Sequence, residues 1–460
     1  MEITVANKII VKNPTENIKK WCASNLVLDN PDYYKKVQMG KWVGNTPRII
    51  SLYEVAGNEF RLPFGCLQDL WKMVGHSVKW SVLFEPIRQV LYQSNINLYD
   101  YQKDAVQAIL GTKNGILVMP CGSGKTQCGI EAIARIGGRA LWLTHTQELL
   151  NQSKSRAESV LDGLKKGMLG TITGGKVNIG THITFATIQT MCNIDLEQYR
   201  DFWDIIVVDE CQRCAGSPTK VTQFYKVLSN LSARYKIGLT ATPHRADGLE
   251  KSMFALLGGI AHEVSRECVK DKTCEVVVNQ VFTNWYPADE EILCGDGTID
   301  YHKVVESMVN DKDRFECVLS NIPTGQPTLV LANRVEYLQR LCDGFDGKSI
   351  CISGAGQSKK AKEERRKALA RLNAGEVDCV FATYSLAKEG LDVPNLRYVV
   401  FATPEKDSTT VIQSVGRVGR KADGKEYGTV IDFVDNFGMY QGWAKKRVGF
   451  YKKIDIKKIF

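Results

Sequence analysis

The sequence predicts an α/β fold with two parallel β-sheets in tandem, preceded by a small mixed N-terminal domain. The first observation is an alternation of short β-branched runs with longer stretches of helical periodicity. This alternation is typical of parallel βαβ units, whose buried strands are apolar on both faces. It begins near residue 98, weakens near residue 265 and resumes near residue 326. The second observation is length, because 460 residues exceed what one ordinary core holds.

The first sheet is expected within residues 96–264 and the second within residues 326–440. The runs that outline the first sheet are GILVM (115–119), ALWLT (140–144), DIIVV (204–208) and KIGLT (236–240). The runs that outline the second are TLVLA (328–332), SICI (349–352), VDCVFAT (377–383), YVVFA (398–402) and TVIDF (429–433). Residues 265–325 have a weaker pattern, which we interpret as an inter-domain connection with inserted structure.

The two ends of the chain carry its positive charge. Residues 1–95 have a net charge of +4 and the basic C-terminal tail, residues 441–460, has +6, while the other 345 residues sum to −1. This excess favours a phosphate-backbone partner, since each contact releases a counterion. A solvated face that only keeps the chain soluble explains it equally well. For the tail, a basic amphipathic helix packed on the second domain is favoured over a grip on DNA.

The composition is that of a globular protein from a reducing compartment. Hydrophobic residues make up 44% of the chain and charged residues 24%. The 14 cysteines are scattered singly rather than in the dense spacing of a disulfide scaffold, which favours reduced thiols and a cytoplasmic location. The N-terminus, MEITVANKII, precedes no long apolar run, so we expect neither a signal peptide nor a membrane span.

A phosphate-binding loop is predicted at MPCGSGKT, residues 119–126, between a predicted strand and a predicted helix. Glycines there let successive backbone N–H groups point at an anion, the lysine adds charge at the β- and γ-phosphates, and the threonine hydroxyl can ligate magnesium. The strict pattern has glycine where this chain has Met119. The expected nucleotide-binding residues of the loop are Pro120, Cys121, Gly122, Ser123, Gly124, Lys125 and Thr126.

Two acids, Asp209 and Glu210, end a predicted buried strand in the same domain, within the sequence VVDECQRC. In an open parallel sheet the carboxyl ends of strands are where ligands bind. One acid can hold magnesium while the other polarises the attacking water. The neighbouring Cys211 and Cys214 have no second cysteine or histidine pair in register, so magnesium is favoured and no zinc is expected.

Two arginines spaced three apart, Arg417 and Arg420, occur in QSVGRVGR (413–420), with Gln413 one turn earlier. On one helical face they could reach across an interdomain cleft toward a γ-phosphate. A plain solvated helix is a poorer explanation, because each glycine costs about 1 kcal/mol in a helix interior.

Taken together, MPCGSGKT, VVDECQRC, GLTATP (238–243) and QSVGRVGR resemble motifs I, II, III and VI of superfamily 2 helicases, in the right order over residues 98–435. The cysteine in the phosphate loop, TPHRADG after motif III and RLPFG at 61–65 are similar to the XPB-like and UvsW-like branch, particularly its phage and viral members. The resemblance implies two RecA-like domains that bind ATP and Mg²⁺.

The resemblance also implies roles for individual residues. Gln102 would read the adenine edge and Tyr99 would stack on it; Asp209 and Thr126 would hold Mg²⁺, and Glu210 would activate water. Gln212 would link motif II to the second domain through an amide hydrogen bond. Coupling is further expected of Thr240, Thr242 and Arg245, and Gly390 and Asp392 of TYSLAKEGLDVP (383–394) would line the nucleotide cleft. The expected DNA-binding residues are Thr144, His145, Thr187, Gln189, Asn333, Arg334, Ser353, Gly354 and Thr383, mostly short polar side chains suited to phosphate and sugar contacts.

The expected function is that of an ATP-driven DNA translocase which unwinds or remodels branched DNA, such as forks and Holliday junctions, in replication, recombination or repair, moving 3′ to 5′. It would act as a monomer on single-stranded and branched DNA, in the host cytoplasm if the chain is viral. The N-terminal domain, 1–95, would bind duplex or junction DNA. A transcription-related translocase is the alternative. A relict, non-catalytic nucleotide site is disfavoured because every charged group needed for hydrolysis is present.

Overall fold

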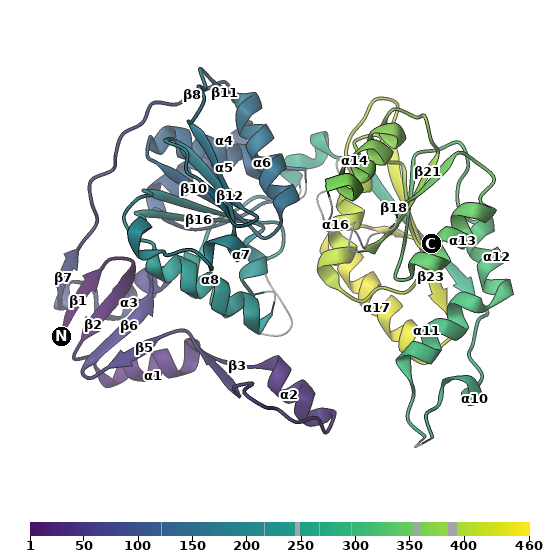
Figure 1. Cartoon of the computed structure of the whole chain (residues 1–460), viewed down its shortest axis with the longest axis horizontal. Helices are drawn as coiled ribbons and strands as arrows, with labels where there is room; N and C mark the ends of the chain where they lie inside the picture. The colour runs from purple at the N-terminus through teal and green to yellow at the C-terminus, as the bar shows by residue number, and fades with distance from the viewer. Residues whose placement is uncertain are drawn as a thin grey trace. The chain divides into compact units, whose positions relative to one another are not determined.

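The computed structural model describes residues 1–460 except 121, 216, 244–248, 266, 296, 353–358 and 385–392. The chain divides into two compact units, Met1–Ser265 and Arg266–Phe460. Figure 1 colours the first from purple to teal and the second from green to yellow. No helix in the described part of the chain is long and apolar enough to cross a membrane.

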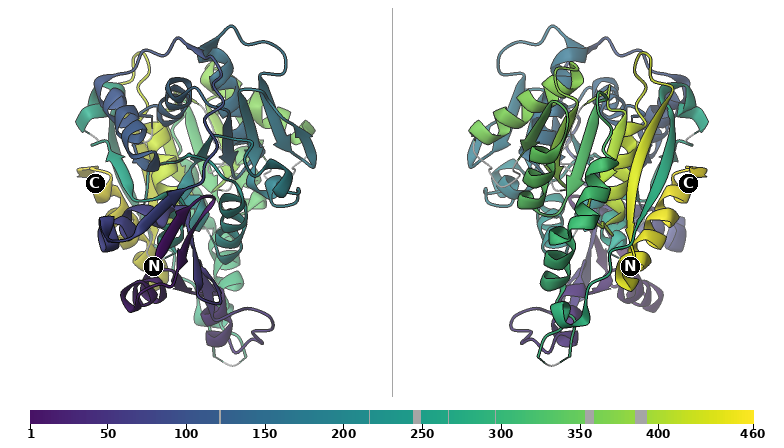
Figure 2. Two further views of the ribbon diagram at one scale, coloured as in Figure 1. Left: turned by 90° about the vertical axis from the view of Figure 1, so that its left-hand side faces the viewer. Right: turned by 90° about the vertical axis from the view of Figure 1, so that its right-hand side faces the viewer.

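Unit 1 begins with a mixed five-stranded sheet in the order β5-β6-β2-β1-β7. Its strands are β1 (Glu2–Val5), β2 (Lys8–Lys12), β5 (Glu54–Ala56), β6 (Glu59–Pro63) and β7 (Lys79–Val82), with helices α1 (Glu16–Asn25) and α3 (Leu67–Val74). Alternate residues of the hairpin β1–β2 are buried, as expected for strands with one face on a core. An arm made of β3 (Val27–Asp29), α2 (Pro31–Gln38) and β4 (Ile49–Ser51) extends away from this sheet (Figures 1 and 2).

The N-terminal domain and the domain that follows share one hydrophobic core. Val221 and Leu249 pack in the same cluster as Ile3 and Leu62. The 3₁₀ turn η1 (Phe64–Cys66) lies directly on α9 (Glu250–Leu257), where a Cβ at Gly65 would collide with backbone atoms of α9 and its C-terminal turn. Only glycine permits this approach. The first 95 residues are therefore part of a larger unit rather than a loosely tethered module.

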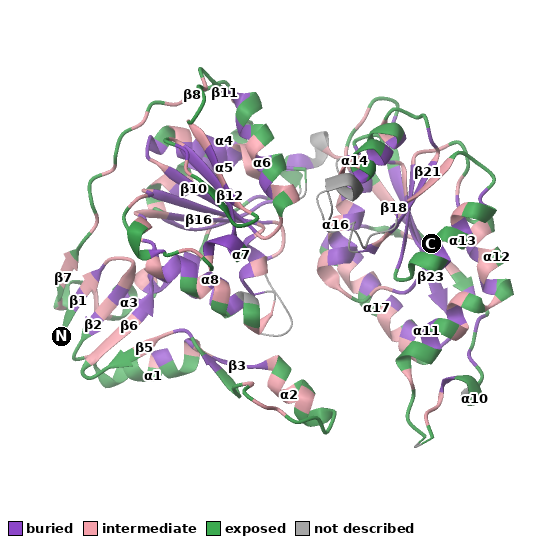
Figure 3. Ribbon diagram, in the orientation of Figure 1, coloured by how far each residue is buried: buried purple, intermediate pink, exposed green. Residues whose placement is uncertain are grey.

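The larger sheet of unit 1 has eight strands in the order β13-β12-β14-β10-β15-β16-β9-β17, parallel throughout except for β13. They are β9 (Asn114–Val118), β10 (Ala140–Thr144), β12 (Leu169–Thr173), β13 (Lys176–Asn178), β14 (Ile183–Thr187), β15 (Ile205–Asp209), β16 (Tyr235–Thr240) and β17 (Ile260–Glu263). Every residue of β9, β10, β14 and β15 is buried, which is why they read as continuous apolar runs (Figure 3).

The direction of each crossover places the helices on two faces of this sheet. The remaining helices of unit 1 are α4 (Asp100–Thr112), α5 (Lys125–Ile136), α6 (Gln147–Val160), α7 (Ile188–Met191) and α8 (Pro218–Asn230). The connection from β9 to β10 runs toward one edge of the sheet, whereas that from β15 to β16 runs toward the other. Because such crossovers are right-handed, α5 and α8 lie on opposite faces (Figure 1). This reversal creates the crevice at the carboxyl edge where ligands bind in such sheets.

Unit 2 is a second, fully parallel sheet in the order β20-β21-β19-β22-β23-β18-β24. Its strands are β18 (Glu275–Thr283), β19 (Thr328–Ala332), β20 (Ser349–Ile352), β21 (Cys379–Thr383), β22 (Tyr398–Phe401), β23 (Tyr427–Asp435) and β24 (Lys458–Ile459). Its helices are α10 (Asp289–Ile292), α11 (Tyr301–Asn310), α12 (Lys312–Ser320), α13 (Val335–Gly344), α14 (Lys359–Asn373), α16 (Ser408–Val418) and α17 (Gly438–Lys453). The predicted α/β fold with two parallel sheets is confirmed.

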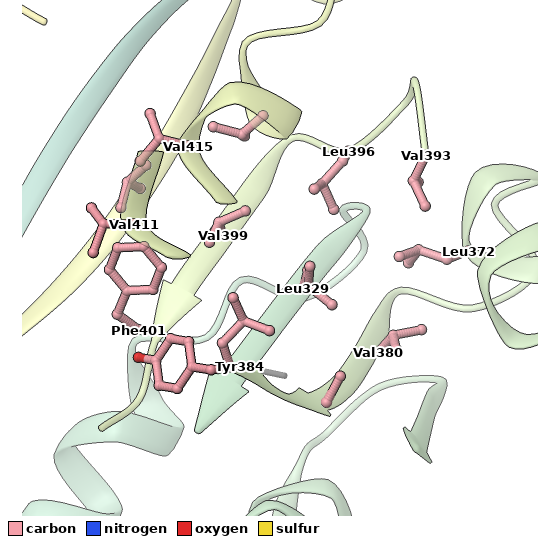
Figure 4. Packing of buried hydrophobic residues seen from close by; sticks show 14 of the residues in the cluster. Leu329, Leu372, Val380, Tyr384, Val393, Leu396, Val399, Phe401, Val411 and Val415 are labelled. Carbon is pink, nitrogen blue, oxygen red and sulfur yellow. The ribbon is translucent and has the colours of Figure 1, made fainter. Parts of the chain in front are cut away.

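Alternate residues of each central strand in unit 2 enter two different cores. Leu329 and Val399 pack with α14 and α16 on one face (Figure 4), whereas Val330 and Val400 pack with α12 and α13 on the other. Residues 275–283, within the range predicted as a connection, form β18 and pair with β23 over nine residues. Asn279 and Gln280 interrupt the apolar pattern of this strand, which hid it in the sequence. The basic tail forms most of α17, whose Tyr451 is buried against the sheet.

Candidate active site

The phosphate loop connects β9 to α5 at the carboxyl edge of the larger sheet. Gly122 and Gly124 adopt left-handed backbone conformations with φ of 82° and 83°, which glycine allows without strain. A Cβ at Gly124 would collide with the amide of Gln102. α5 begins at Lys125, so the free N–H groups of its first turn face the loop and favour an anion there. Met119 is fully buried and its N–H donates to Thr240 O at 2.8 Å.

Lys125 and Ser123 hold the loop from within. Lys125 Nζ lies 3.4 Å from Met119 O, so its ammonium group spans the loop. The buried Ser123 hydroxyl donates to Pro120 O at 2.6 Å. Thr126 follows at the second position of α5 and is half-buried. These residues form a cradle with one positive charge and open space in front of Gly122.

The residues expected to contact adenine lie beside the phosphate loop, and Gln102 is hydrogen-bonded to it. Gln102 is 2% exposed; its Oε1 accepts from Tyr99 N at 3.0 Å and its Nε2 donates to Ser123 O at 2.7 Å. The Tyr101 hydroxyl donates to the same carbonyl at 3.2 Å, a contact that the motif pattern did not indicate. Tyr99 is 48% exposed and stacks on Tyr101 with centroids 5.9 Å apart, so one face of its ring is available to a base.

Asp209, the last residue of β15, is a buried acid without a basic hydrogen-bond partner among the described residues. Its Oδ2 accepts from Ser153 Oγ at 3.2 Å and its Oδ1 from Glu210 N at 3.0 Å. Burial, and next the charge of Glu210, raise the pKa of Asp209 to about 6, against the opposing effect of Lys125. Such a carboxylate is stabilised by a cation placed beside it.

Glu210 has a left-handed backbone with φ of 51°, which is rare for a residue with a Cβ and typical of functional sites. Its carboxylate accepts a hydrogen bond from Gln212 Nε2. Gln212 Oε1 in turn accepts from Thr240 Oγ1 at 2.7 Å, and Thr240 Oγ1 accepts from Thr242 N at 3.0 Å. The amide of Gln212, expected to reach toward the second domain, thus connects motif II to motif III inside unit 1.

Ser153 was missed by motif reasoning, although the sequence carries a signal for it. It lies on α6 in a buried stripe with Leu150, Ala157 and Val160, where a serine interrupts otherwise apolar spacing. A polar residue in such a stripe needs a partner, and here the partner is Asp209.

Cys211 and Cys214 are core residues. Both are fully buried in the turn η4 (Cys211–Ala215), and the Cys211 thiol lies 3.5 Å from Met253 Sδ. Burial raises the pKa of both thiols well above the usual range, so they stay protonated at neutral pH and are poor metal ligands. The described residues contain no group of three or more His, Cys, Asp or Glu arranged to hold a metal.

The predicted arginines lie in unit 2, but not on one helix. Arg417 is in α16 and is 8% exposed. The helix ends at Val418, and Arg420 lies beyond it in a β-bridge with Thr273. The second glycine of GRVGR caps the helix, which is why the helical spacing fails there. Gln413 Oε1 is buried and has no hydrogen-bond partner within the described residues.

The predicted DNA-binding residues of unit 1 gather at the carboxyl edge of the sheet. Thr144 and Thr187 are paired across β10 and β14. Both hydroxyls are buried in local hydrogen bonds, from Thr144 to Thr146 O at 2.9 Å and from Thr187 to Thr190 Oγ1 at 3.0 Å. Gln189 is exposed and donates to His145 O at 2.9 Å, so Gln189 is the more accessible of the group.

In unit 2, Asn333 and Arg334 follow β19 and are exposed, and Thr383 ends the neighbouring β21. Asn333 Nδ2 donates to Pro404 O at 3.3 Å, and Arg334 Nη2 lies 3.4 Å from His302 Nδ1. The remaining predicted site residues, Cys121, Arg245, Ser353, Gly354, Gly390 and Asp392, lie outside the described residues.

Comparison with known families matches both sheets of the chain. Residues 95–245 match the model described as "Type III restriction enzyme, res subunit", and residues 312–422 match "Helicase conserved C-terminal domain". The two matches cover the phosphate loop, the paired acids and the segment that carries Arg417 and Arg420.

Curated relatives include archaeal and viral proteins. The "DNA 3'-5' translocase XPB2" of Sulfurisphaera tokodaii is 24% identical over 72% of this chain and 81% of its own length. The "Putative ATP-dependent RNA helicase L396" of Acanthamoeba polyphaga mimivirus is 26% identical over 74% of this chain and 64% of its own. "Putative helicase 22" of a Sulfolobus islandicus filamentous virus is 25% identical over 77% of this chain and 67% of its own.

Among solved structures, the type ISP restriction-modification enzyme LlaBIII bound to DNA covers 78% of this chain and 30% of that one, at a TM-score of 0.57 and 18% identity. T4 UvsW covers 100% and 99%, at a TM-score of 0.42 and 20% identity. The likeness to LlaBIII shows a shared fold. With both domain models matched in order and the motif residues in place, the chain belongs to the superfamily 2 helicases, a family of helicase and translocase enzymes.

Proposed function

We propose that the chain is an ATP-dependent DNA translocase that moves 3′ to 5′ and unwinds or remodels branched DNA, such as forks and four-way junctions, in replication, recombination or repair. The names of the relatives support DNA as the track and 3′ to 5′ as the direction. The shared fold supports a motor built of two parallel-sheet domains.

The residues of unit 1 fit ATP with magnesium. Backbone N–H groups of the loop and of α5 would hold the phosphates together with Lys125, and Asp209 with Thr126 would hold the metal. Magnesium, when bound, supplies charge neutralisation at the phosphates. Glu210 would orient and deprotonate the attacking water. Gln212 would hold the Glu210 carboxylate in place, because its side-chain amide is hydrogen-bonded to both Glu210 and Thr240. Arg417 and Arg420 of unit 2 would act on the γ-phosphate when the units close.

The observation that carries the preference for branched DNA is the arm of unit 1, residues 27–51. Residues 33–50 contain four cations and no acid. Trp42 near its tip is 87% exposed, and α2 has no buried residue (Figure 3). An exposed indole among cations suits stacking on an end base pair beside phosphates. A junction exposes such base-pair ends, whereas continuous duplex does not.

Hydrogen bonds within the arm hold its conformation, which favours a defined contact with DNA. Lys36 Nζ donates to Thr46 Oγ1 at 2.6 Å, and Asn30 Nδ2 to Pro47 O at 2.7 Å, so both ends of the loop are tied together. Because the N-terminal domain shares its core with the ATP-binding domain, hydrolysis in unit 1 moves the arm with it.

Because of this shared core, deleting the N-terminal domain is not a clean test of its role. Deleting residues 1–95 would expose Val221 and Leu249, so loss of activity would report misfolding. We therefore choose the surface variant Lys41→Glu/Trp42→Ala. The matched control is Lys165→Glu/Lys166→Glu, which alters two exposed lysines elsewhere in unit 1.

In the arm variant, the rate of ATP hydrolysis stimulated by single-stranded DNA should stay within about twofold of wild type. The rate of unwinding of forks and four-way junctions should fall about tenfold, because one stacking contact and one phosphate contact are lost. The control variant should match wild type on both substrates. Equal junction unwinding by the arm variant and wild type would contradict the assignment to branched DNA, and stimulation by RNA alone would contradict DNA as the track.

A further inference from the structure

A cavity of about 560 Å³ lies in unit 1 where the N-terminal domain meets the larger sheet. One wall comes from η1, α3 and β7, and the other from residues 112–114 and Arg234. Residue 114 begins β9, whereas the phosphate loop follows the carboxyl end of that strand. The cavity therefore lies at the opposite edge of the sheet from the ATP site, and none of its described lining residues belongs to motifs I, II, III or VI.

Aromatic rings form the domain wall of the cavity. Trp71 and Trp80 lie with centroids 5.1 Å apart, and Phe64 meets Phe84 edge to face at 5.7 Å. The Trp80 indole is fixed by a hydrogen bond from its Nε1 to Gly75 O at 2.7 Å. Trp71 is still 43% exposed. Rigid rings with exposed faces are the surfaces on which nucleobases stack.

The opposite wall is formed by residues 112–114 and Arg234. Asn114 is 2% exposed, and its side-chain amide packs against Gly258, beneath the wall. Lys113 is exposed, and the Arg234 guanidinium donates from Nη2 to Glu85 O at 3.4 Å. The groups of this wall that a ligand can reach are therefore the two cationic side chains.

The cavity is also positively charged. Lys72, Lys113 and Arg234 line it, and none of the described lining residues is Asp or Glu. A ligand that combines a flat ring and negative charge matches both features.

We propose that this cavity binds one unpaired nucleotide, with its base against Trp71 and Trp80 and its phosphate near Lys72, Lys113 and Arg234. The nucleotide comes either from a DNA strand with a base out of the stack or from a free mononucleotide. The proposal goes beyond the motor function and does not require that the DNA be branched.

Photocrosslinking tests the site and its source together. The full chain is irradiated with a short single-stranded oligodeoxynucleotide containing one 5-iodo-deoxyuridine, or separately with free 5-iodo-deoxyuridine monophosphate. Trypsin then cuts after Arg61, Lys72, Lys79 and Arg88, which isolates peptides 62–72 and 80–88 for mass spectrometry. An adduct on either peptide in the oligonucleotide arm alone identifies a strand as the source, and an adduct in the free-nucleotide arm shows that mononucleotides enter.

Two variants separate binding from folding. Trp71→Leu and Lys113→Gln should each lower the adduct yield at least tenfold. Lys113 is exposed, so the melting temperature of Lys113→Gln should match that of wild type. The control Tyr286→Leu, at a 60% exposed aromatic of unit 2, should stay within about twofold of wild type. Absence of adducts from both peptides in both arms, or adducts unaffected by Trp71→Leu and Lys113→Gln, would overturn the proposal.

Discussion

The buried acids near the carboxyl edges of the two large sheets differ in their partners. In unit 1, buried Asp209 accepts only from a serine hydroxyl and a backbone N–H, and its pKa is raised to about 6. In unit 2, Asp432 and Asp435 of β23 are fully buried as well, but each meets an arginine. Arg314 Nε lies 2.6 Å from Asp435 Oδ1, and Arg447 Nη2 lies 2.7 Å from Asp432 Oδ1.

The difference teaches how to separate a ligand site from a structural ion pair. A buried acid in a parallel strand is not by itself a site, since Asp435 ends β23, Asp432 lies three residues earlier, and both are neutralised within their own domain. Thr283 and Tyr451 complete their hydrogen bonds at 2.6 and 2.9 Å. Asp209 lacks such a partner among the described residues and lies beside a second acid. Lys125 offsets its charge only in part, which leaves Asp209 able to bind a further cation.

The largest effect is expected where a buried pair is broken. Arg314→Met should lower the free energy of unfolding of unit 2 by about 3–5 kcal/mol, because Asp435 would remain buried without its counter-charge. Hydrogen exchange of β23 amides, followed by mass spectrometry, measures this locally. The control Arg366→Met, at an exposed surface pair on α14, should change it by less than about 1 kcal/mol. Equal effects would mean that the Arg314–Asp435 pair is not structural.

A smaller effect of opposite sign is expected at Asp209. The folded pKa of about 6 lies above the ordinary aspartate pKa of 3.8, so ionised Asp209 destabilises the folded state above pH 6, and this cost fades as the pH falls toward 3.8. Asp209→Asn should therefore raise the stability of unit 1 by about 1–2 kcal/mol at pH 7.5, and by much less at pH 4.5.

Exchange of β15 amides checks this prediction, and Asp435→Asn is the matched control. The same change there should destabilise β23, since it leaves Arg314 buried without a charge partner. If Asp209→Asn also destabilised its strand at pH 7.5, the carboxylate would have a compensating partner and the contrast between the two sheets would fail.

The parts of the molecule that could be predicted from the sequence are those encoded in consecutive residues. The loop from Met119 to Thr126 and the acid pair at 209–210 follow buried apolar strands, and the structure brings them to one edge of one sheet. What could not be predicted depends on distant partners. The N-terminal domain packs on the domain that follows because Gly65 contacts α9, which is nearly two hundred residues further along the chain.

The other differences have local causes. β18 is masked by Asn279 and Gln280 within an otherwise apolar strand. Arg420 leaves the helix because Gly419 caps it, although three-residue spacing suggested one face. The Gln212 side-chain oxygen accepts a hydrogen bond from Thr240. The motif pattern does not indicate this partner, because it depends on β15 and β16 being neighbours in the sheet.

The central claim, that the carboxyl edge of unit 1 is a seat for a nucleotide and its magnesium ion, is tested most directly by calorimetric titration of ATP at pH 7.5 with and without Mg²⁺. Wild type should bind ATP at least tenfold more tightly when Mg²⁺ is present, and Asp209→Asn should lose most of that gain while still binding ATP through Lys125 and the loop. An equal gain from Mg²⁺ in wild type and Asp209→Asn would contradict the account.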